Sequence, residues 1–296
     1  MHVPVLSKEI IEGLAFAPGQ TFLDGTVGSG GHSALVSDLF GGKIKIIGLD
    51  LDADAINRAR EKLAKYDKSV TLVQESFRNL DKVLADLAIQ KVDRVLFDLG
   101  MSSEELELSG RGFSFLKDEP LQMTFRNPPI NDQLTAADIV NNWSEESIKT
   151  IIEAYGEERF ARKIAAGIVG SRAKKEISTT AELASVVSKA TPGWYHRRKT
   201  HEATKTFQAL RIAVNNELEA LMDGLKKAVM SLSPSGRIAV ITFNSLEDRI
   251  VKRYFNDLAK SGEGAIAFKK PVVGTKQEIK ENPRARSAKL RILIKA

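Results

Sequence analysis

Three carboxylates in this chain each end a short apolar run: Asp24, Asp50 and Asp98. Four of the seven residues after Asp24 are glycines, and an amphipathic stretch follows them. Glycine permits positive φ and lets a ligand lie directly against the backbone, and the free N–H groups of a helix start favour anionic or polar ligand groups. The pattern is typical of a strand, a tight turn and a helix that together hold a ligand.

The second carboxylate makes a nucleotide-type cofactor the favoured ligand. Asp50 lies 26 residues after Asp24, and an acid at the tip of the second strand is where Rossmann-like sheets hold a ribose diol. By itself a glycine-rich turn is equally consistent with an ordinary turn. The spacing Asp24-x-Thr26-x-Gly28-x-Gly30 differs from the dehydrogenase fingerprint and is closer to the loop of S-adenosylmethionine (SAM) methyltransferases.

Alternating strands and helices must position these acids. Strands are expected at 22–24, 44–50, 70–74 and 92–98, with helices at 33–40, 53–65 and 79–88. Mostly unbroken apolar strands between amphipathic helices predict an α/β fold with a parallel sheet covered on both faces. A fifth strand at 237–243 and an antiparallel edge pair at 265–270 and 288–294 bring the expected sheet to seven strands.

Asp98 ends the fourth strand, which neighbours the first at the switch point of such a sheet. We therefore expect Asp98 to face the same crevice as Gly28 and Gly30. The alternative is an acid that only caps the turn after its strand.

The strand pattern stops between residues 104 and 201. Helices are expected there at 136–142, 147–155, 159–172 and 180–189, and a long helix over 207–225 returns the chain to the sheet. The expected organisation is a discontinuous sheet domain, 1–103 and 202–296, with an inserted helical domain, 104–201.

The net charge of +6 is unevenly distributed. Residues 159–199 contain ten Lys and Arg against two Glu, residues 268–296 contain nine against two, and residues 104–158 contain four against twelve acids. Two basic surfaces suggest a polyanionic partner, although solvated lysines on helix faces give the same composition. The run 194–199 places aromatic residues next to cations, as in many nucleic-acid contacts. The alternative is a loop whose aromatic residues only pack against the rest of the protein.

The composition argues against several other classes. The chain has no cysteine, and its four histidines have no metal-ligand spacing, so no metal site is expected. No apolar run approaches the roughly 20 residues that span a bilayer, and no targeting pattern is recognisable at the start. A cytoplasmic protein without membrane contact is therefore expected.

Eight blocks of sequence resemble one known family. They are 2–6, 24–33, 98–103, 111–115, 156–165, 201–218, 245–252 and 282–291. The chain is similar over nearly its whole length to the bacterial 16S ribosomal RNA cytosine-N4 methyltransferases. The resemblance implies a class I SAM-dependent methyltransferase with a Rossmann-like sheet and an inserted, all-helical substrate-recognition domain. Its substrate would be the exocyclic amine of a decoding-centre (P-site) cytosine in 16S rRNA of the small ribosomal subunit, and the enzyme would be a monomer or homodimer.

The resemblance also implies roles for individual residues. The expected cofactor contacts are Gly28, Gly30, Gly31, His32, Asp50, Phe77, Asp98 and Glu105. Arg197, Arg198, Lys199, Arg284 and Arg286 are expected to hold RNA phosphates. Read from the residues alone, Phe77 could equally pack in the core and His32 could face solvent.

Some positions depart from the family pattern. Glu105 stands where the family has a cofactor-contacting glutamine, and a carboxylate cannot donate the hydrogen bond that an amide can. The segment 122–126 changes three charges, and Asn244 replaces a histidine. These departures concern base recognition and rate more than cofactor binding.

Methyl transfer to cytosine N4 requires groups that accept the hydrogens of a poorly nucleophilic amine. Asp98 and Ser102 stand in the chain position where amino-methyltransferases hold the amine, and Asn244 is either a third polar group of the site or a helix N-cap. The alternative functions are a SAM-dependent methyltransferase of another RNA or of DNA cytosine, and a ribosome-binding factor with impaired turnover.

Overall fold

The computed structural model describes residues 4–296, so that His2 of the first matching block lies outside the described part. The chain divides into two compact units, one formed by 1–100 with 218–296 and the other by 101–217. Each unit has its own hydrophobic core. Residues far apart in sequence therefore build the first unit.

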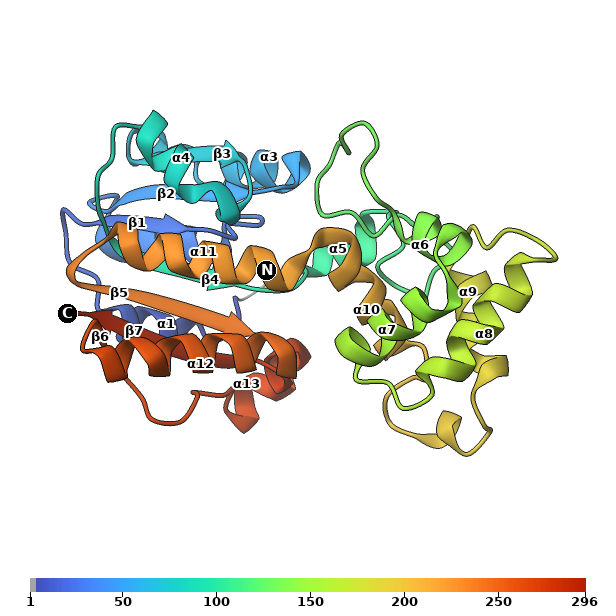
Figure 1. Ribbon diagram of the computed structural model, residues 1–296. Helices are drawn as coiled ribbons and strands as arrows, with labels where there is room; N and C mark the ends of the chain where they lie inside the picture. The colour runs from blue at the N-terminus through green and yellow to red at the C-terminus, as the bar shows by residue number, and fades with distance from the viewer. Residues whose placement is uncertain (1–3) are drawn as a thin grey trace. The chain divides into compact units, whose positions relative to one another are not determined.

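The first unit is built on a seven-stranded sheet (Figure 1). Its strands are β1 Thr21–Asp24, β2 Lys45–Asp50, β3 Val70–Gln74, β4 Val92–Asp98, β5 Leu232–Thr242, β6 Gly264–Ile266 and β7 Lys289–Lys295. Their order is β3-β2-β1-β4-β5-β7-β6. Strands β1 to β5 are parallel, and β7 is antiparallel to both β5 and β6. The prediction of an α/β fold with a mostly parallel seven-stranded sheet is confirmed, and β1 lies between β2 and β4 as the switch point requires.

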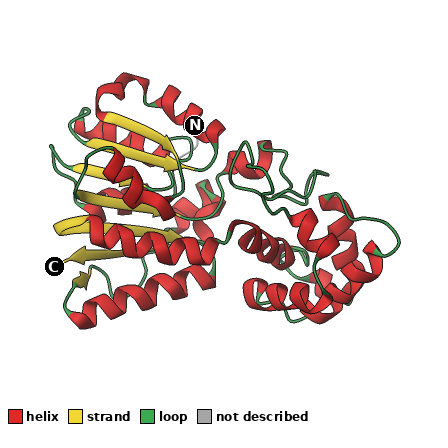
Figure 2. Ribbon diagram, turned by 45° about the horizontal axis from the view of Figure 1, so that its top comes forward, coloured by secondary structure: helices red, strands yellow, loops and turns green. Residues whose placement is uncertain are grey.

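Helices cover both faces of this sheet, as Figure 2 shows. They are α1 Ser7–Leu14, α2 Gly31–Phe40, α3 Ala53–Lys62, α4 Leu80–Asp86, α11 Glu217–Ser231, α12 Ser245–Ser261 and α13 Lys276–Glu281, with 3-10 turns η1 Ala64–Ser69, η2 Phe77–Asn79 and η4 Pro283–Arg286. Adjacent residues of a strand serve opposite layers: Leu23 packs with residues of α4, α11 and α12, and Phe22 packs with residues of α1 and α2. Burial on both faces explains the nearly continuous apolar runs of the strands.

The regular elements described in the second unit are helices. They are α5 Ser103–Leu108, α6 Ala136–Asn142, α7 Glu145–Gly156, α8 Ala161–Arg172, α9 Thr180–Ala190 and α10 Thr204–Asn215, with the 3-10 turn η3 Tyr195–Arg197. Four of them start where a hydroxyl accepts a backbone N–H: Ser102 before α5, Thr135 before α6, Ser144 before α7 and Thr179 before α9. These N-caps satisfy donors that have no partner within the helix, so the positions of these helix starts follow directly from the sequence.

The single long helix expected over 207–225 is wrong. The chain forms α10 and α11 instead, separated at Asn216, whose φ of 48° and ψ of 43° are left-handed. Asparagine tolerates this conformation better than other non-glycine residues, while the apolar spacing continues across the break and conceals it. Helix α10 packs on α7 within the second unit, whereas the sequence-based boundary at 201 assigned it to the sheet domain.

Other differences are local. Strand β5 begins at Leu232 rather than 237, because the expected turn at Ser235 and Gly236 is an irregularity within the strand, where the pairing with β4 shifts. Strand β6 is shorter than expected. Helices α1, α5 and α13 were not predicted; α5 and α13 have only six residues each.

The left-handed residue between α10 and α11 gives a stability test. Asn216→Ala should lower the free energy of unfolding by about 1 kcal/mol, since alanine is strained at positive φ. Asn216→Gly should change it by a few tenths at most, because glycine adopts this conformation freely. Urea denaturation followed by circular dichroism measures both. Equal stability of the two variants would contradict a left-handed break at this position.

Candidate cofactor site

Two hydrogen bonds connect the loop after β1 to the ends of the neighbouring strands. The N–H of Gly28 donates to Asp50 Oδ2 at 2.9 Å, and the N–H of Asp98 donates to Thr26 Oγ1 at 2.7 Å. The other oxygen of Asp50 accepts the N–H of Asp52 at 2.9 Å. The structure thus brings Gly28, Asp50 and Asp98 together at the carboxyl edge of the sheet. Sequence analysis missed Thr26, although it lies inside the glycine loop.

The glycines of this loop have different roles. Gly28 and Gly30 have φ of 51° and 78°, which disfavour other residues. A Cβ at Gly28 would meet only Thr26 O, at 4.0 Å, so the backbone there is accessible to a ligand. A Cβ at Gly30 would lie 3.3 Å from Ala59 Cα of α3, and one at Gly31 would lie 2.9 Å from Pro4 Cγ. These last two glycines permit close packing of α2.

The buried His32 and the partly exposed Asp98 form a polar pair beside the loop. The ring of His32 is 7% exposed, and its Nε2 lies 3.6 Å from Asp98 Oδ2, too far for a hydrogen bond. Among residues 4–296 neither ring nitrogen, nor Asp98 Oδ1, has a hydrogen-bond partner. The solvent-facing alternative for His32 is therefore wrong. Buried polar atoms without partners are costly, which marks this pair as a place where a ligand supplies the missing hydrogen bonds.

The buried Asp24 stabilises the loop through hydrogen bonds. Its carboxylate is 1% exposed and accepts hydrogen bonds from Ser33 Oγ at 2.7 Å and from the N–H of Thr26 at 3.4 Å. Burial raises the pKa of this carboxyl to about 6, with Asp98 adding to the rise; the hydrogen bond from Ser33 and the nearby His32 act in the opposite direction. Asp24 therefore holds the turn in shape rather than facing a ligand.

Phe77 has the packing role that was the alternative to cofactor contact, and remains only half-buried. It starts η2, directly after β3, and its ring centroid lies 4.8 Å from that of Phe97. A Cβ at Gly224 of α11 would lie 2.4 Å from Phe77 Cδ2. The glycine thus leaves room for the ring between the helix and the sheet.

Asn244 is the N-cap of α12. Its Oδ1 accepts the N–H groups of Leu246 and Glu247, each at 3.0 Å, and Glu247 returns a contact to the backbone N–H of Asn244. The oxygen that would accept an amine hydrogen is occupied by the cap. The geometry supports the capping alternative.

Ser102 and Glu105 lie in the second unit, where they start α5. Ser102 Oγ accepts the N–H of Glu105 at 3.0 Å, and Glu105 Oε2 accepts the N–H of Ser102 at 2.7 Å. This is a capping box, which glutamine and glutamate form equally well. The replacement of the family's glutamine by Glu105 therefore preserves the local structure.

The cations predicted on the second unit are exposed. Arg197 belongs to η3, and Arg198 and Lys199 follow it in the loop. Beneath them Tyr195 is buried, and its hydroxyl donates to Glu158 Oε2 at 2.5 Å. Burial and this carboxylate raise the pKa of Tyr195 to about 12. The exposed cations therefore lie on a turn that the buried Tyr195 anchors to the protein.

On the first unit, Arg284 and Arg286 lie in η4. Arg286 is exposed, while Arg284 is half-buried with its Cζ 5.7 Å from the ring centroid of Phe243. Phe243 in turn approaches Gly100, where a Cβ would lie 3.3 Å from the ring. Arg284 therefore lies near the carboxyl ends of β4 and β5.

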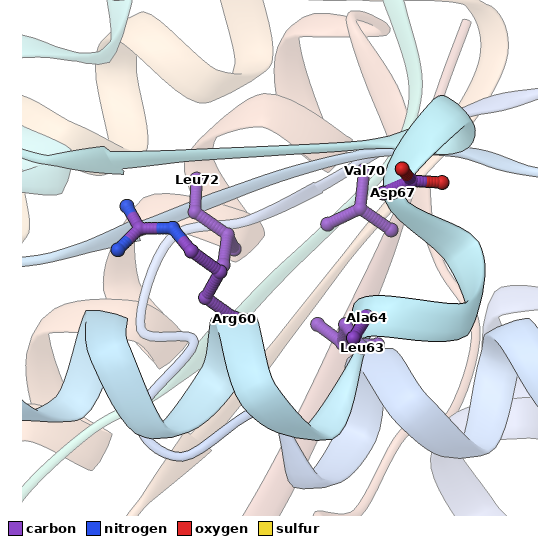
Figure 3. A pocket seen from close by; sticks show the side chains of 6 residues that line it. All are labelled: Arg60, Leu63, Ala64, Asp67, Val70 and Leu72. Carbon is purple, nitrogen blue, oxygen red and sulfur yellow. The ribbon is translucent and has the colours of Figure 1, made fainter.

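A separate depression of about 360 Å³ lies on the flank of the first unit (Figure 3). Its lining comes from α3, η1 and β3: Arg60, Leu63, Ala64, Asp67, Val70 and Leu72. None of the residues singled out in the sequence line it. Within residues 4–296, no three metal-ligating side chains gather as a metal site would require, and no helix has the length and apolar character needed to cross a membrane.

The buried Asp24 predicts a pH-dependent difference in stability. Its folded pKa of about 6 exceeds the ordinary value of 3.8, so the native state binds the extra proton between these values. The stabilisation that Asp24 contributes to the folded state is thus complete below pH 4 and is lost as the pH rises through 6. The free energy of unfolding of D24N minus that of the wild type should rise by roughly 2–3 kcal/mol from pH 4 to pH 7.

Urea denaturation at stepped pH measures this difference, in which the other titrating groups cancel. D86N changes the same charge on an exposed residue of α4 and should give a nearly constant difference. A constant difference for D24N as well would show that the pKa of Asp24 is not raised.

Comparison with known proteins identifies the family of the chain. The model of the MraW methylase family matches residues 1–296. The protein named ribosomal RNA small subunit methyltransferase H of Sulfurihydrogenibium sp. (strain YO3AOP1) is 46% identical over 293 residues, which are 98% of either chain. The protein of the same name from Brevibacillus brevis is 42% identical in an alignment 309 positions long, which covers 99% of this chain and 98% of the relative.

A solved structure, an rRNA methylase from Streptococcus thermophilus, matches with a TM-score of 0.44 and 10% identity, over 98% of this chain and 93% of the other. The sheet order found here and the whole-length family match agree on a methyltransferase that uses SAM. The chain belongs to the MraW methylase family.

Proposed function

We propose that this chain transfers a methyl group from SAM to the exocyclic N4 of a decoding-centre (P-site) cytosine in 16S rRNA. The observation that carries the proposal is the pair of buried His32 and partly exposed Asp98, in which both ring nitrogens of His32 and Asp98 Oδ1 lack hydrogen-bond partners among residues 4–296. The pair lies beside the glycine loop of a chain in a methylase family. The relatives named as small-subunit rRNA methyltransferases supply the substrate class.

The residues present fit SAM. When bound, SAM supplies an electrophilic methyl group on a positively charged sulfur. Asp50 would hold the ribose hydroxyls, because hydrogen bonds to both of its oxygens fix its orientation. The backbone at Gly28 allows close approach, and the first N–H groups of α2, at Gly31 and His32, have no acceptor within the helix. The half-buried ring of Phe77 would flank the adenine.

Asp98 is the residue best suited to position the reacting amine. The lone pair of cytosine N4 is delocalised into the ring, so the amine becomes nucleophilic only when acceptors hold its hydrogens. Asp98 Oδ1 has no partner among the described residues, and Ser102 Oγ, which already accepts one N–H, keeps a second lone pair. A positioned acceptor that also takes the proton contributes roughly 10²–10⁴-fold. The proposal assigns Asn244 to capping.

The exposed cations would hold the RNA. A structured base must leave its stack to reach such a site, and phosphate contacts position the flanking strand. Arg197, Arg198 and Lys199 on the helical second unit, and Arg284 and Arg286 on the first, would make these contacts. In this proposal the helical unit recognises the substrate.

Methyl transfer to purified 30S particles tests the function. The wild type with labelled SAM should form N4-methylcytidine in 16S rRNA, identified by nuclease digestion and mass spectrometry. In single turnover at saturating SAM, D98N should be slower by roughly 10²–10⁴-fold, and D86N should match the wild type. Methyl groups only on another RNA, only on DNA, or binding without transfer would each overturn the proposal.

The ribose contact is tested separately by cofactor affinity. D50N should bind S-adenosylhomocysteine roughly 10- to 100-fold more weakly in isothermal titration calorimetry, because the amide offers one acceptor oxygen where the carboxylate offers two charged ones. D86N again serves as the charge-matched control. An affinity of D50N within twofold of the wild type would remove Asp50 from the site.

A further inference from the structure

The second unit carries an exposed tryptophan among cations. Trp194 is 51% exposed, and it follows the turn after α9. Other large apolar side chains are at least as exposed, among them Leu116 at 86%, so exposure alone does not indicate a partner. Trp194 differs from them in the aromatic rings and cations that lie around it.

The surroundings of Trp194 are well fixed. Its ring meets those of Phe160 and Tyr195 edge to face, with centroids 5.9 and 5.7 Å away. Both neighbours depend on Glu158, which accepts the N–H of Phe160 at 2.9 Å and the hydroxyl of Tyr195 at 2.5 Å. No ring in the described part of the chain stacks parallel on Trp194. The alternative that the aromatic residues of 194–199 only pack against the protein thus accounts for Tyr195. It does not account for Trp194, half of which remains exposed.

One cation lies over the Trp194 ring, and two others lie over the neighbouring rings. Arg159 Cζ lies 4.6 Å from the Trp194 ring centroid and 4.8 Å from that of Phe160. Lys163 Nζ lies 5.9 Å from the Phe160 ring, and Arg198 Cζ lies 4.8 Å from the Tyr195 ring. Of the two adjacent carboxylates, Glu158 is 2% exposed and Glu157 is exposed. The exposed cations Arg159, Lys163 and Arg198 outnumber this one accessible acid, so the accessible charge is mainly positive.

We propose that Trp194 stacks on an unpaired base of the RNA substrate, while Arg159 and Lys163 contact the adjacent phosphates. Aromatic faces beside cations are how proteins hold single-stranded nucleic acid, and residues 159–199 carry ten Lys and Arg against two Glu. The inference rests on the proposed function for the RNA itself and adds the residue that grips an unpaired nucleotide. An acidic protein or an anionic membrane could contact the same charge and the same ring, but relatives named as ribosomal RNA methyltransferases favour RNA as the occupant.

The test uses the intrinsic fluorescence of the full chain. Trp143 and Trp194 are the two tryptophans, so a W143F background makes Trp194 the sole reporter. Titration with an unstructured 12-nucleotide RNA should quench its emission. W194A, measured with labelled RNA, should bind roughly 5- to 100-fold more weakly, and W194F should recover part of the loss. L116A, which removes a more exposed apolar side chain from the same unit, should bind as the wild type does.

Salt dependence separates stacking from charge. W194A should lower the affinity by the same factor at each salt concentration, whereas K163A should reduce the slope of log affinity against log salt by roughly 0.7. Unchanged RNA binding by W194A, with normal methylation of 30S particles, would overturn the stacking and leave the proposed function intact. Quenching by anionic vesicles or an acidic peptide but not by RNA would likewise overturn it. Failure of the wild type to methylate 30S particles would overturn the proposed function instead.

Discussion

The loop between β1 and α2 is held by hydrogen bonds to two neighbouring strands, and the site depends on them. Gly28 reaches Asp50 at the end of β2, and Thr26 reaches Asp98 at the end of β4. The loop, Asp50 and Asp98 are therefore fixed relative to one another by hydrogen bonds within the protein, and these are the groups proposed to contact the ribose and the amine. Such preorganisation means that binding requires little rearrangement of these groups.

Much of the fold could be predicted because parallel strands buried on both faces are continuous apolar runs. Once β1 lies between β2 and β4, the acids after these strands must share one edge of the sheet. The break at Asn216 could not be predicted, since it depends on a single left-handed residue within an uninterrupted apolar pattern. The irregular start of β5 is equally local.

For the site, the sequence gives residue types but not their burial. That His32 is enclosed with unpartnered nitrogens is visible only in three dimensions. Two helix caps, in contrast, can be recognised from the sequence spacing. Ser102 to Glu105 and Asn244 to Glu247 both have the spacing of a capping box, and both form one. Both spacings identify Ser102 and Asn244 as helix N-caps, and Ser102 alone stays a proposed acceptor because its oxygen accepts one backbone N–H where that of Asn244 accepts two.

The packing of Gly30 against Ala59 and of Gly31 against Pro4 has a consequence for how such loops are interpreted. Gly30 and Gly31, two of the four glycines that follow Asp24, are required for α2 to lie close to its neighbours, whether or not a ligand binds. A descendant that had lost catalysis would keep these two glycines for as long as it kept its fold. Whether a relative can bind a ligand here is better judged from His32 and Asp98, because both ring nitrogens of His32 and Asp98 Oδ1 have no hydrogen-bond partner among the described residues.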